Sequence, residues 1–496
     1  MTTEQHDSAT PTAAPTAVRM VIGGESVDAA DGGTFDVVNP ATGKVIAKVP
    51  LGGREDVDRA VAAAQKAFED RKGRATWAAG KRGRTLAKFA SLVKANSEEL
   101  AQLETANVGK PITSSRGEVI GASLVFDYYA GAANKVFGQT IPVSKPGIDM
   151  TLREPIGVVG LIVPWNFPIL MASWKLGPAL AAGNACILKP ASYSPLTAIR
   201  LGELADEAGI PAGILNVVTG PGGTAGASIA AHPGIGKVAF TGETTTGQEI
   251  MRLASSNVKK ISLELGGKSP NIVFADADLE RFAKESPYSV FDNCGQDCCA
   301  RSRILVERSA HDRVVELFAE ATRKVKVGDP TEDATEVGTL VSAKQLERVK
   351  DYIEIGLGEG ATLVVGGTAP DDPTLADGAY LMPAVFDGVS NDMRIAKEEI
   401  FGPVVSVIPF DTEEEALRIA NATPYGLSGS IWSRDIGKAL RTAKGLQAGV
   451  ISVNSNSSVH TEAPFGGYKM SGIGRELGMA ALDLYMETKN VFIDLT

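Results

Sequence analysis

Residues 157–209 read GVVGLIVPWNFPILMASWKLGPALAAGNACILKPASYSPLTAIRLGELADEAG. Two short apolar runs in this stretch, GVVGLIVPW and NACILKP, have the composition of strands that are buried on both faces of a sheet. A helical segment follows each run, and the second is bounded by Ser194 as N-cap, Pro195 at the first position and Gly209 at the end. Strands that alternate with helices of this length predict a parallel sheet with right-handed crossovers.

The same alternation extends along most of the chain. Further apolar strands are predicted at ILNVVTG, KVAFTG, KKISLELGG and NIVFAD, and the pattern resumes after residue 300 with SRILVE, VVSVIPF and GLSGSIWS. Helices are predicted at 56–68 and 83–104. The chain therefore predicts two α/β blocks that meet near residues 265–295, and the seam between two such blocks is a common place for an active site.

Two segments fit neither block. Residues 138–155 and 486–496 are strand-like and isolated from the helical pattern. Edge strands of this kind are often covered by a partner subunit, so they predict a homo-oligomer, either a dimer or a tetramer.

Composition excludes several classes of protein. The 496 residues are 44% hydrophobic and 22% charged, as in an ordinary soluble protein. Residues 1–17 are rich in Thr, Ala and Pro and predict a loose tail that lacks the pattern of a signal peptide. No apolar run approaches the roughly 18 residues of a membrane span, and a net charge of −10 argues against nucleic acid as a partner.

Three of the four cysteines lie in the stretch FDNCGQDCCARSR (291–303) as Cys294, Cys298 and Cys299. Four cysteines in a chain of this length do not make a disulfide scaffold, which predicts a reducing, cytoplasmic location. Their spacing lacks the paired pattern of a zinc site, and the four histidines are scattered, so no metal is predicted. One reactive thiol remains as the alternative.

Four further motifs carry polar groups suited to chemistry, each with a purely structural alternative. GPGGTAG (220–226) resembles a dinucleotide loop but lacks the acidic residue about twenty positions later. GETTTG (242–247) opens a helix whose N–H groups attract phosphate, although a carboxylate at Glu243 would repel it. Glu264 in LELGGKSP could be a general base or a core ion-pair member. Asn166 in VPWNFP could donate to an oxyanion or cap a turn.

Taken together, these motifs resemble the aldehyde dehydrogenase superfamily from FDVVNPATGKVIAKVP to METKNVFIDL, with PWNFP, FTGETTTG, LELGGKSP, GQDCCA, KEEIFGPVV and PFGGYKMSGIGRELG between. The resemblance implies an α/β fold: a Rossmann-like parallel-sheet cofactor domain, an α/β catalytic domain and a small β oligomerisation arm. The expected boundaries are 18–135 and 156–265 for the cofactor domain, 266–467 for the catalytic domain, and 136–155 and 480–496 for the arm.

The resemblance also implies a catalytic set. Cys298, two residues after the Gln of GQ, matches the nucleophile, and Glu264, 34 residues earlier, matches the base. Asn166 and the backbone N–H of Cys298 match the oxyanion donors, and Lys175 is a supporting or proton-relay residue. This set predicts that an aldehyde is oxidised to its carboxylic acid through a thiohemiacetal and a thioester on Cys298.

For the cofactor the resemblance implies NAD, bound by residues of both blocks. The expected contacts are Ile162, Val163, Pro164, Trp165, Lys189, Ser192, Gly222, Phe240, Gly242, Glu243, Thr246, Gly247, Leu265, Gln345, Glu399 and Phe401. Ser192 stands where many NAD-preferring members have a Glu that repels a 2′-phosphate, so NADP is also possible. Glu243 replaces a phosphate-binding Ser, and Arg301 stands where Gly is usual.

The substrate is expected to be a small-molecule aldehyde. The residues that correspond to the family's substrate contacts are Phe167, Met171, Trp174, Asp297, Cys299, Ser457 and Phe465. The aromatic residues suit a broad aliphatic or aromatic aldehyde, whereas Asp297 leaves an amino- or betaine-type aldehyde open. Two other classes stay open: a catalytically silent relative that only binds the cofactor, and a hydrolase or acyltransferase that uses the same thiol.

Overall fold

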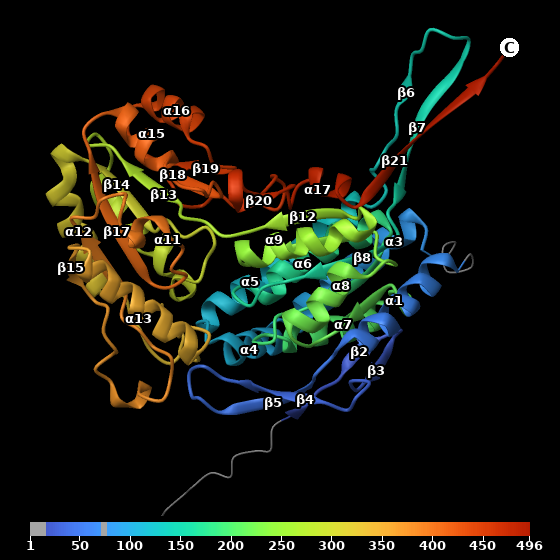
Figure 1. Cartoon of the computed structure of the whole chain (residues 1–496), viewed down its shortest axis with the longest axis horizontal. Helices are drawn as coiled ribbons and strands as arrows, with labels where there is room; N and C mark the ends of the chain where they lie inside the picture. Colours follow the sequence, from blue (N-terminus) through green and yellow to red (C-terminus); the bar gives the residue numbers. More distant parts are fainter. Residues whose placement is uncertain (1–15, 71–76) are drawn as a thin grey trace, which may run out of the picture.

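The computed structural model describes residues 16–70 and 77–496 (Figure 1). Two α/β bodies lie side by side, each built on its own sheet, and a small sheet projects from one of them (Figure 1). This architecture agrees with the alternation of strands and helices in the sequence.

The first body contains an eight-stranded sheet of order β20-β12-β11-β8-β9-β10-β2-β3. Its neighbours from β12 to β10 are parallel, and the outer pairs are antiparallel. The strands are β2 (Met20–Ile22), β3 (Glu25–Val27), β8 (Val158–Ile162), β9 (Ala185–Lys189), β10 (Leu215–Val217), β11 (Lys237–Thr241), β12 (Lys260–Glu264) and β20 (Gly472–Ile473). The helices of this body are α1 (Arg54–Glu69), α3 (Ala79–Ala95), α4 (Ser97–Val108), α5 (Ile112–Ala132), α6 (Pro168–Ala182), α7 (Leu196–Ala208), α8 (Ala227–Ala231), α9 (Thr244–Ala254) and α17 (Ala480–Asp483).

The second body contains a seven-stranded sheet of order β15-β16-β17-β14-β13-β18-β19, in which only the β15–β16 pair is antiparallel. The strands are β13 (Pro270–Val273), β14 (Arg303–Glu307), β15 (Thr362–Val365), β16 (Ala384–Asp387), β17 (Val404–Phe410), β18 (Ser428–Trp432) and β19 (Val450–Val453). The helices are α10 (Leu279–Glu285), α11 (Tyr288–Phe291), α12 (His311–Arg323), α13 (Ala343–Gly358), α14 (Arg394–Lys397), α15 (Glu413–Asn421) and α16 (Ile436–Gly445).

The two segments that fitted neither block pair with each other. Strand β7 (Gly147–Pro155) runs antiparallel to β21 (Met486–Asp494) along its whole length, and β6 (Thr140–Ile141) joins its other edge. Figure 1 shows this sheet extending away from the first body. A further small sheet contains β1 (Thr16–Ala17), β4 (Thr34–Val38) and β5 (Val45–Pro50).

Three local predictions differ from the structure. The predicted tail of residues 1–17 lies outside the described residues except for Thr16 and Ala17, which form β1. The helix predicted at 83–104 divides at Asn96 into α3 and α4. Ser194 is not the N-cap of α7, because Pro195 occupies that position and the Oδ1 atom of Asn107 in α4 accepts from the first helical N–H instead.

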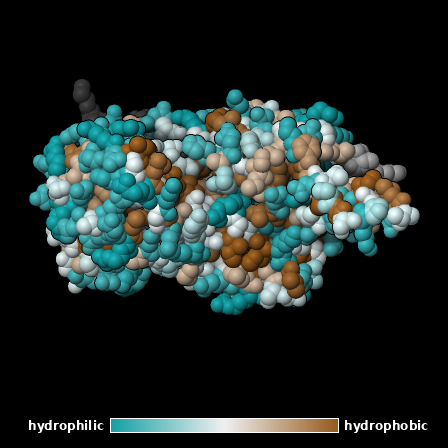
Figure 2. Space-filling model, turned by 90° about the horizontal axis from the view of Figure 1, so that it is seen from above, coloured by the Kyte–Doolittle hydropathy of each residue, from teal (hydrophilic) through white to brown (hydrophobic). Residues whose placement is uncertain are grey.

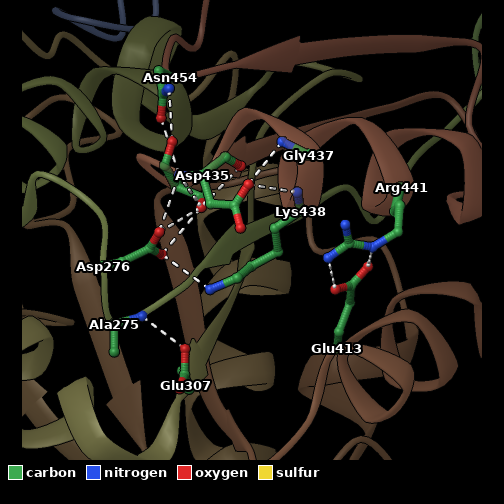
Figure 3. Close-up of polar contacts among 10 residues, drawn as sticks. Ala275, Asp276, Glu307, Glu413, Asp435, Gly437, Lys438, Arg441 and Asn454 are labelled. Atoms are coloured by element: carbon green, nitrogen blue, oxygen red, sulfur yellow. Dashed lines mark hydrogen bonds and ion pairs between the residues drawn. The ribbon is translucent and has the colours of Figure 1, made fainter.

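A polar network closes the end of the second sheet beside the segment that follows β19 (Figure 3). The side chain of Asn454 exchanges two hydrogen bonds with the backbone of Ser433, and the Ser433 hydroxyl donates to the Asp276 carboxylate. Asp276 also accepts from the ammonium of Lys438. These contacts hold residue 454, where the chain leaves the sheet, in a defined position.

Candidate active site

A cavity of about 520 Å³ is lined by both bodies. The first body contributes the carboxyl ends of β8, β11 and β12 and the first turns of α6 and α9, and the second contributes the turn at residues 297–299, helix α13 and residues 398–401. Its lining residues are Pro164, Trp165, Asn166, Phe167, Leu170, Met171, Trp174, Thr241, Gly242, Glu243, Thr244, Thr245, Glu264, Leu265, Gly266, Asp297, Cys298, Cys299, Gln345, Arg348, Tyr352, Glu398, Glu399, Phe401, Tyr425, Val459, Phe465 and Glu476.

The turn before Cys298 has a strained backbone. Asn293, Cys294 and Gly295 have φ values of +50°, +57° and +70°, a left-handed conformation that side chains other than glycine rarely adopt. A side chain at Gly295 is excluded, since its Cβ would lie 2.2 Å from the Gly402 carbonyl oxygen. Such a conformation persists only where the surroundings over-determine it, which is common at functional sites.

Hydrogen bonds from buried side chains hold this turn. The Gln296 amide donates to the carbonyl oxygens of Asn293 and Thr339 and accepts from the Val341 N–H. The Asn293 amide donates to the carbonyl oxygen of Asn166 at 2.7 Å. The turn is therefore fixed both to its own body and to the loop after β8.

Cys298 is half-buried and lines the cavity, whereas Cys294 is buried in the core of the second body. All four cysteines of the chain are free thiols. A hydrogen bond with Cys299, together with burial and the nearby carboxylates of Asp297 and Glu399, raises the pKa of Cys298 well above 9.0. The thiol is accordingly held protonated and needs a base before it can act as a nucleophile.

Asn166 lines the same cavity as Cys298. One amide N–H of Asn166 donates to the Gln296 carbonyl oxygen at 2.9 Å, which leaves the second N–H available. The backbone N–H of Cys298 has no acceptor among the described residues. Two unused donors thus flank the cysteine that lines the cavity.

Glu264 lies at the carboxyl end of β12 and lines the same cavity. Its side chain is 5% exposed, and its Oε2 atom has no hydrogen-bond partner in the described part of the chain. Burial, and then the carboxylate of Glu476, raises the pKa of Glu264 well above 4.5, while Lys175 and Arg475 act in the opposite direction. A carboxyl group with this environment can exchange protons near neutral pH.

Lys175 lies behind the cavity wall rather than in it. Its ammonium is fully buried, donates to Thr241 Oγ1 at 2.6 Å and forms an ion pair with Glu476. Because Glu476 does line the cavity, the pair connects the interior of the first body with the site.

The cofactor residues predicted from FTGETTTG lie at the start of α9. The first helical hydrogen bond runs from the Gly247 N–H to the Glu243 carbonyl oxygen, so three preceding N–H groups have no acceptor within the helix. Gly247 packs on Leu265, and Gly242 packs on Phe240; a Cβ at either glycine would lie 2.7 Å or 2.6 Å from that side chain, which would have to shift. Backbone thus lies exposed at the end of the helix that favours anions.

The second body contributes Gln345, Glu399 and Phe401 to the cavity. Gln345 donates to the Phe401 carbonyl oxygen at 2.8 Å, and the Phe401 ring meets Trp165 edge-on with centroids 5.2 Å apart. Glu399 accepts from the Gly267 N–H at 3.0 Å, and burial raises its pKa to about 7. A Cβ at Gly266 would lie 2.1 Å from the Glu399 carboxylate, so a larger residue there would displace that carboxylate.

Several predicted cofactor residues lie outside the cavity lining: Ile162, Val163, Lys189, Ser192, Gly222, Phe240, Thr246 and Gly247. Lys189 ends β9, beside β8, and the Lys189 side chain passes within 3.8 Å of where a Gly226 Cβ would be. Ser192 donates to the Gly220 carbonyl oxygen at 3.2 Å. Lys189, Ser192 and the GPGGTAG turn therefore lie together at the carboxyl edge of the sheet, next to the cavity.

These residues fit a dinucleotide. The helix start supplies N–H donors for a pyrophosphate, the glycines leave room for close approach, and Lys189 adds a buried cation whose pKa burial lowers to about 8. The GPGGTAG segment forms a single turn before α8 and lies beside Lys189.

The other end of the cavity is aromatic and apolar. Trp174 and Phe465 meet edge-on with centroids 4.9 Å apart, and Phe167 and Met171 lie on the same lining. The ammonium of Lys110 lies 4.1 Å from the centre of the Phe167 ring. Ser457 is exposed and does not line the cavity, because its N–H turns back to Ser455 Oγ; Val459 is the residue of this loop that lines it.

Asp297 lines the cavity but is already hydrogen-bonded. Its carboxylate accepts from the Cys299 N–H at 2.8 Å. The ligand atoms of Asp297, Cys298 and Cys299 lie within 4.8 Å of one another, closer than the sequence spacing had suggested for metal ligands. Among the described residues no fourth ligand atom joins these three, and a closed structural zinc site takes four.

Sequence reasoning missed several residues of this site. Glu476 stood within the quoted motif PFGGYKMSGIGRELG, but nothing in that motif showed that its carboxylate reaches Lys175. Arg348 and Tyr352 lie three and seven residues after Gln345 on α13, so helical periodicity could have placed them on the same face. Thr244 and Thr245 lie within the quoted motif GETTTG, from which the prediction took only Thr246 of the three threonines, and Tyr425 had no sequence signal.

Comparison with known proteins agrees with this geometry. The profile of the aldehyde dehydrogenase family matches residues 27–491. The chain is 45% identical over 475 residues to a betaine aldehyde dehydrogenase of Bacillus subtilis (strain 168), covering 95% of this chain and 96% of that protein.

Two crystal structures superpose closely. One is a betaine aldehyde dehydrogenase of Staphylococcus aureus in complex with NAD⁺, with a TM-score of 0.94, 41% identity and coverage of 96% and 94% of the two chains. The other is an indole-3-acetaldehyde dehydrogenase of P. syringae in complex with NAD⁺, with a TM-score of 0.93, 46% identity and coverage of 96% of each chain.

The predicted family, fold class and enzyme class are confirmed by these matches. Because the match spans nearly the whole chain, the chain belongs to the aldehyde dehydrogenase family, whose members oxidise aldehydes with NAD or NADP.

Proposed function

We propose that this protein oxidises an aldehyde to its carboxylic acid with NAD, using Cys298 as nucleophile, Glu264 as general base and Asn166 as oxyanion donor. One observation carries the proposal. These three side chains come from segments up to 132 positions apart, and they line one cavity between the two bodies. A relative that only binds the cofactor and has no catalytic activity would not need to retain these three residues.

Each residue has a defined task. Cys298 gives up its proton to water in the cavity, and its sulfur then attacks the aldehyde carbon, which converts the carbonyl oxygen to an oxyanion. The free N–H of Asn166 and the backbone N–H of Cys298 are the two donors available to stabilise that charge. Loss of hydride from the carbon then leaves a thioester on Cys298. Glu264 removes a proton from the water that hydrolyses the thioester, and the acid is released.

The start of α9, Lys189 and Glu399 would hold the cofactor. Bound NAD supplies the acceptor for the hydride that leaves the aldehyde carbon. NAD fits the complexes known for the two structural relatives. Ser192 has no negative charge, so the site also tolerates the extra phosphate of NADP.

Absorbance at 340 nm with a panel of aldehydes tests the proposal. Cys298→Ala should abolish NADH formation, whereas Glu264→Gln should form about one equivalent of NADH and then stall at the thioester. Steady turnover by Cys298→Ala would contradict the assignment of the nucleophile. Turnover of activated esters without any aldehyde oxidation would instead favour the hydrolase alternative.

A neutral aliphatic or aromatic aldehyde suits the apolar end of the cavity best. Trp174, Phe465 and Met171 offer hydrophobic contact. Lys110 already occupies one face of the Phe167 ring, and Asp297 is already engaged by the Cys299 N–H, so both attract an ammonium group less strongly.

A betaine- or amino-type aldehyde is the second candidate, because the Bacillus subtilis and Staphylococcus aureus relatives are betaine aldehyde dehydrogenases. Phenylacetaldehyde and betaine aldehyde compared at equal concentration separate the two. A kcat/KM at least about tenfold higher for phenylacetaldehyde, about 1.4 kcal/mol of transition-state binding, is expected. The reverse order would favour the second candidate.

The same proposal extends to assembly, domains and location. The sheet of β6, β7 and β21 exposes the apolar side chains of Ile141, Ile148, Leu152, Phe492 and Ile493, and Figure 2 shows hydrophobic groups at that end of the molecule. We infer a homo-oligomer, a dimer or tetramer, in which a partner covers this sheet. We also propose the division into cofactor, catalytic and arm domains that the sequence predicts; the arm strand β21 begins at Met486, after helix α17 (Ala480–Asp483) of the first body.

No helix within residues 16–70 and 77–496 is long and apolar enough to cross a membrane. Four free thiols suit a reducing compartment, which supports the cytoplasm as the place of action.

A further inference from the structure

Arg301 is a buried arginine that the proposed chemistry does not use. It follows the nucleophile by three residues, is 2% exposed and does not line the cavity. A guanidinium at this depth is costly unless its N–H groups find acceptors. Its contacts therefore indicate what it does.

Those contacts join three separate segments. Nη1 donates to the carbonyl oxygen of Cys299 and to Ser428 Oγ at 2.7 Å, and Nε donates to Ser430 Oγ at 2.9 Å. Nη2 donates to Ser458 Oγ at 2.9 Å. Four of the five donors of the guanidinium are thus occupied, by the nucleophile turn, strand β18 and the loop after β19.

The acceptors are neutral, so Arg301 is held by hydrogen bonds and not by an ion pair. Asp297 attracts it electrostatically, but its carboxylate accepts from the Cys299 N–H. A planar fork with fixed donor directions suits such a junction, whereas a lysine ammonium could not reach the same acceptors together. The guanidinium therefore holds the three segments in fixed positions relative to one another.

The loop of residues 454–463, here called the substrate loop, depends on few anchors. Asn454 fixes its start through Ser433 (Figure 3). Near its end, the Thr461 carbonyl oxygen accepts from the Gly478 N–H at 2.9 Å. Within it, the Ser455 carbonyl oxygen accepts from Ser452 Oγ at 2.6 Å, and Asn456 makes one long contact of 3.4 Å to Ser286 Oγ. Ser458 is the next anchored residue, and Val459, which lines the cavity, follows directly.

We propose that Arg301 is a positioning residue that sets the aldehyde end of the cavity by tying Ser458 of the substrate loop to the Cys299 carbonyl beside the nucleophile. Arg301 contacts both segments, so it fixes the position of Val459 relative to Cys298. This inference rests on the proposed function, because it assigns the loop to aldehyde binding.

Two variants separate this role from a general effect on folding. Ser458→Ala removes only the loop contact, and Arg301→Lys keeps the charge but not the fork. Both should raise the KM for phenylacetaldehyde by about tenfold, the worth of a hydrogen bond to a charged group, while kcat changes by less than about twofold. Ser458→Thr retains a hydroxyl that can accept from Arg301, so its KM should equal that of the parent protein. Arg441→Lys, at a surface pair with Glu413, is the matched control (Figure 3).

Hydrogen exchange supplies a second readout that needs no activity. Amides of residues 454–463 should exchange faster in Ser458→Ala and Arg301→Lys, with those of α6 unchanged. An unaltered KM together with unaltered exchange in Ser458→Ala would overturn the proposal. If the parent protein oxidises no aldehyde, the proposed function fails, and loop exchange alone still decides whether Arg301 positions the loop.

Discussion

Lys175 and Glu476 form a buried ion pair close to Glu264, the proposed base, although 301 positions separate the two partners in the chain. The side chains are 0% and 6% exposed. A charge pair at this depth gains little net stability, but removing one partner leaves the other charge buried and unpaired.

Glu476→Gln should therefore lower the free energy of unfolding by about 3–5 kcal/mol. The double variant Lys175→Met/Glu476→Gln should recover most of that loss, because no unpaired charge remains. Urea denaturation measures both. Glu413→Gln, which breaks an exposed pair with Arg441, should cost less than about 1 kcal/mol. Equal losses in the buried and exposed variants would contradict the argument.

The same two residues should shift the pH dependence of thioester hydrolysis in opposite directions. Glu476 raises the pKa of Glu264 and Lys175 lowers it. Glu264 acts as a base only when it is deprotonated, so the rate rises with pH through its pKa. Glu476→Gln should move that rise to lower pH, and Lys175→Met should move it to higher pH. Single-turnover hydrolysis followed across pH tests this, and a shift of both variants in one direction would refute it.

Ser192 should control discrimination against NADP. Ser192→Glu places a carboxylate at the carboxyl edge of the first sheet, where it would repel a 2′-phosphate. We expect kcat/KM with NADP to fall at least about tenfold and that with NAD to change by less than about threefold. Ser192→Ala, which only removes the hydrogen bond to the Gly220 carbonyl oxygen, should affect both cofactors equally. If the ratio of the kcat/KM values with NADP and NAD is unchanged in Ser192→Glu, the ribose that carries the 2′-phosphate does not bind beside Ser192.

Glu104 should make the protein less stable as pH rises. It is fully buried, its Oε2 atom has no partner in the described part of the chain, and burial together with Glu118 raises its pKa from 4.5 to about 8. Between these values the unfolded chain loses the proton and the folded protein keeps it, so unfolding is favoured by up to about 1.4 kcal/mol per pH unit.

Glu104→Gln should remove this slope and still accept the hydrogen bond from Thr197. The gain in melting temperature over the parent should be small at pH 5 and largest at pH 8, as scanning calorimetry would show. A gain that is the same at both pH values would mean that Glu104 is ionised in the folded protein.

The sequence determined much of this structure by itself. The apolar runs at 158–162 and 185–189 became central strands because their side chains are buried on both faces, which is what a continuous hydrophobic run indicates. Gly209 ends α7 with φ +88°, as predicted, because a left-handed cap favours glycine. The resemblance of the motifs to the aldehyde dehydrogenase family predicted Cys298, Glu264 and Asn166 as one site, and all three line the cavity.

Only the tertiary structure decided which distant groups meet. Pro195 occupies the N-cap position of α7, and Asn107 of another helix, not Ser194, accepts from the first helical N–H. The role of Arg301 could not be inferred from its place in the sequence, because its acceptors Ser428, Ser430 and Ser458 come from other segments. The hydrophobic pattern of one segment indicates which of its own side chains are buried. Hydrogen bonds between distant segments depend on how those segments pack together, and this cannot be inferred from any single stretch of sequence.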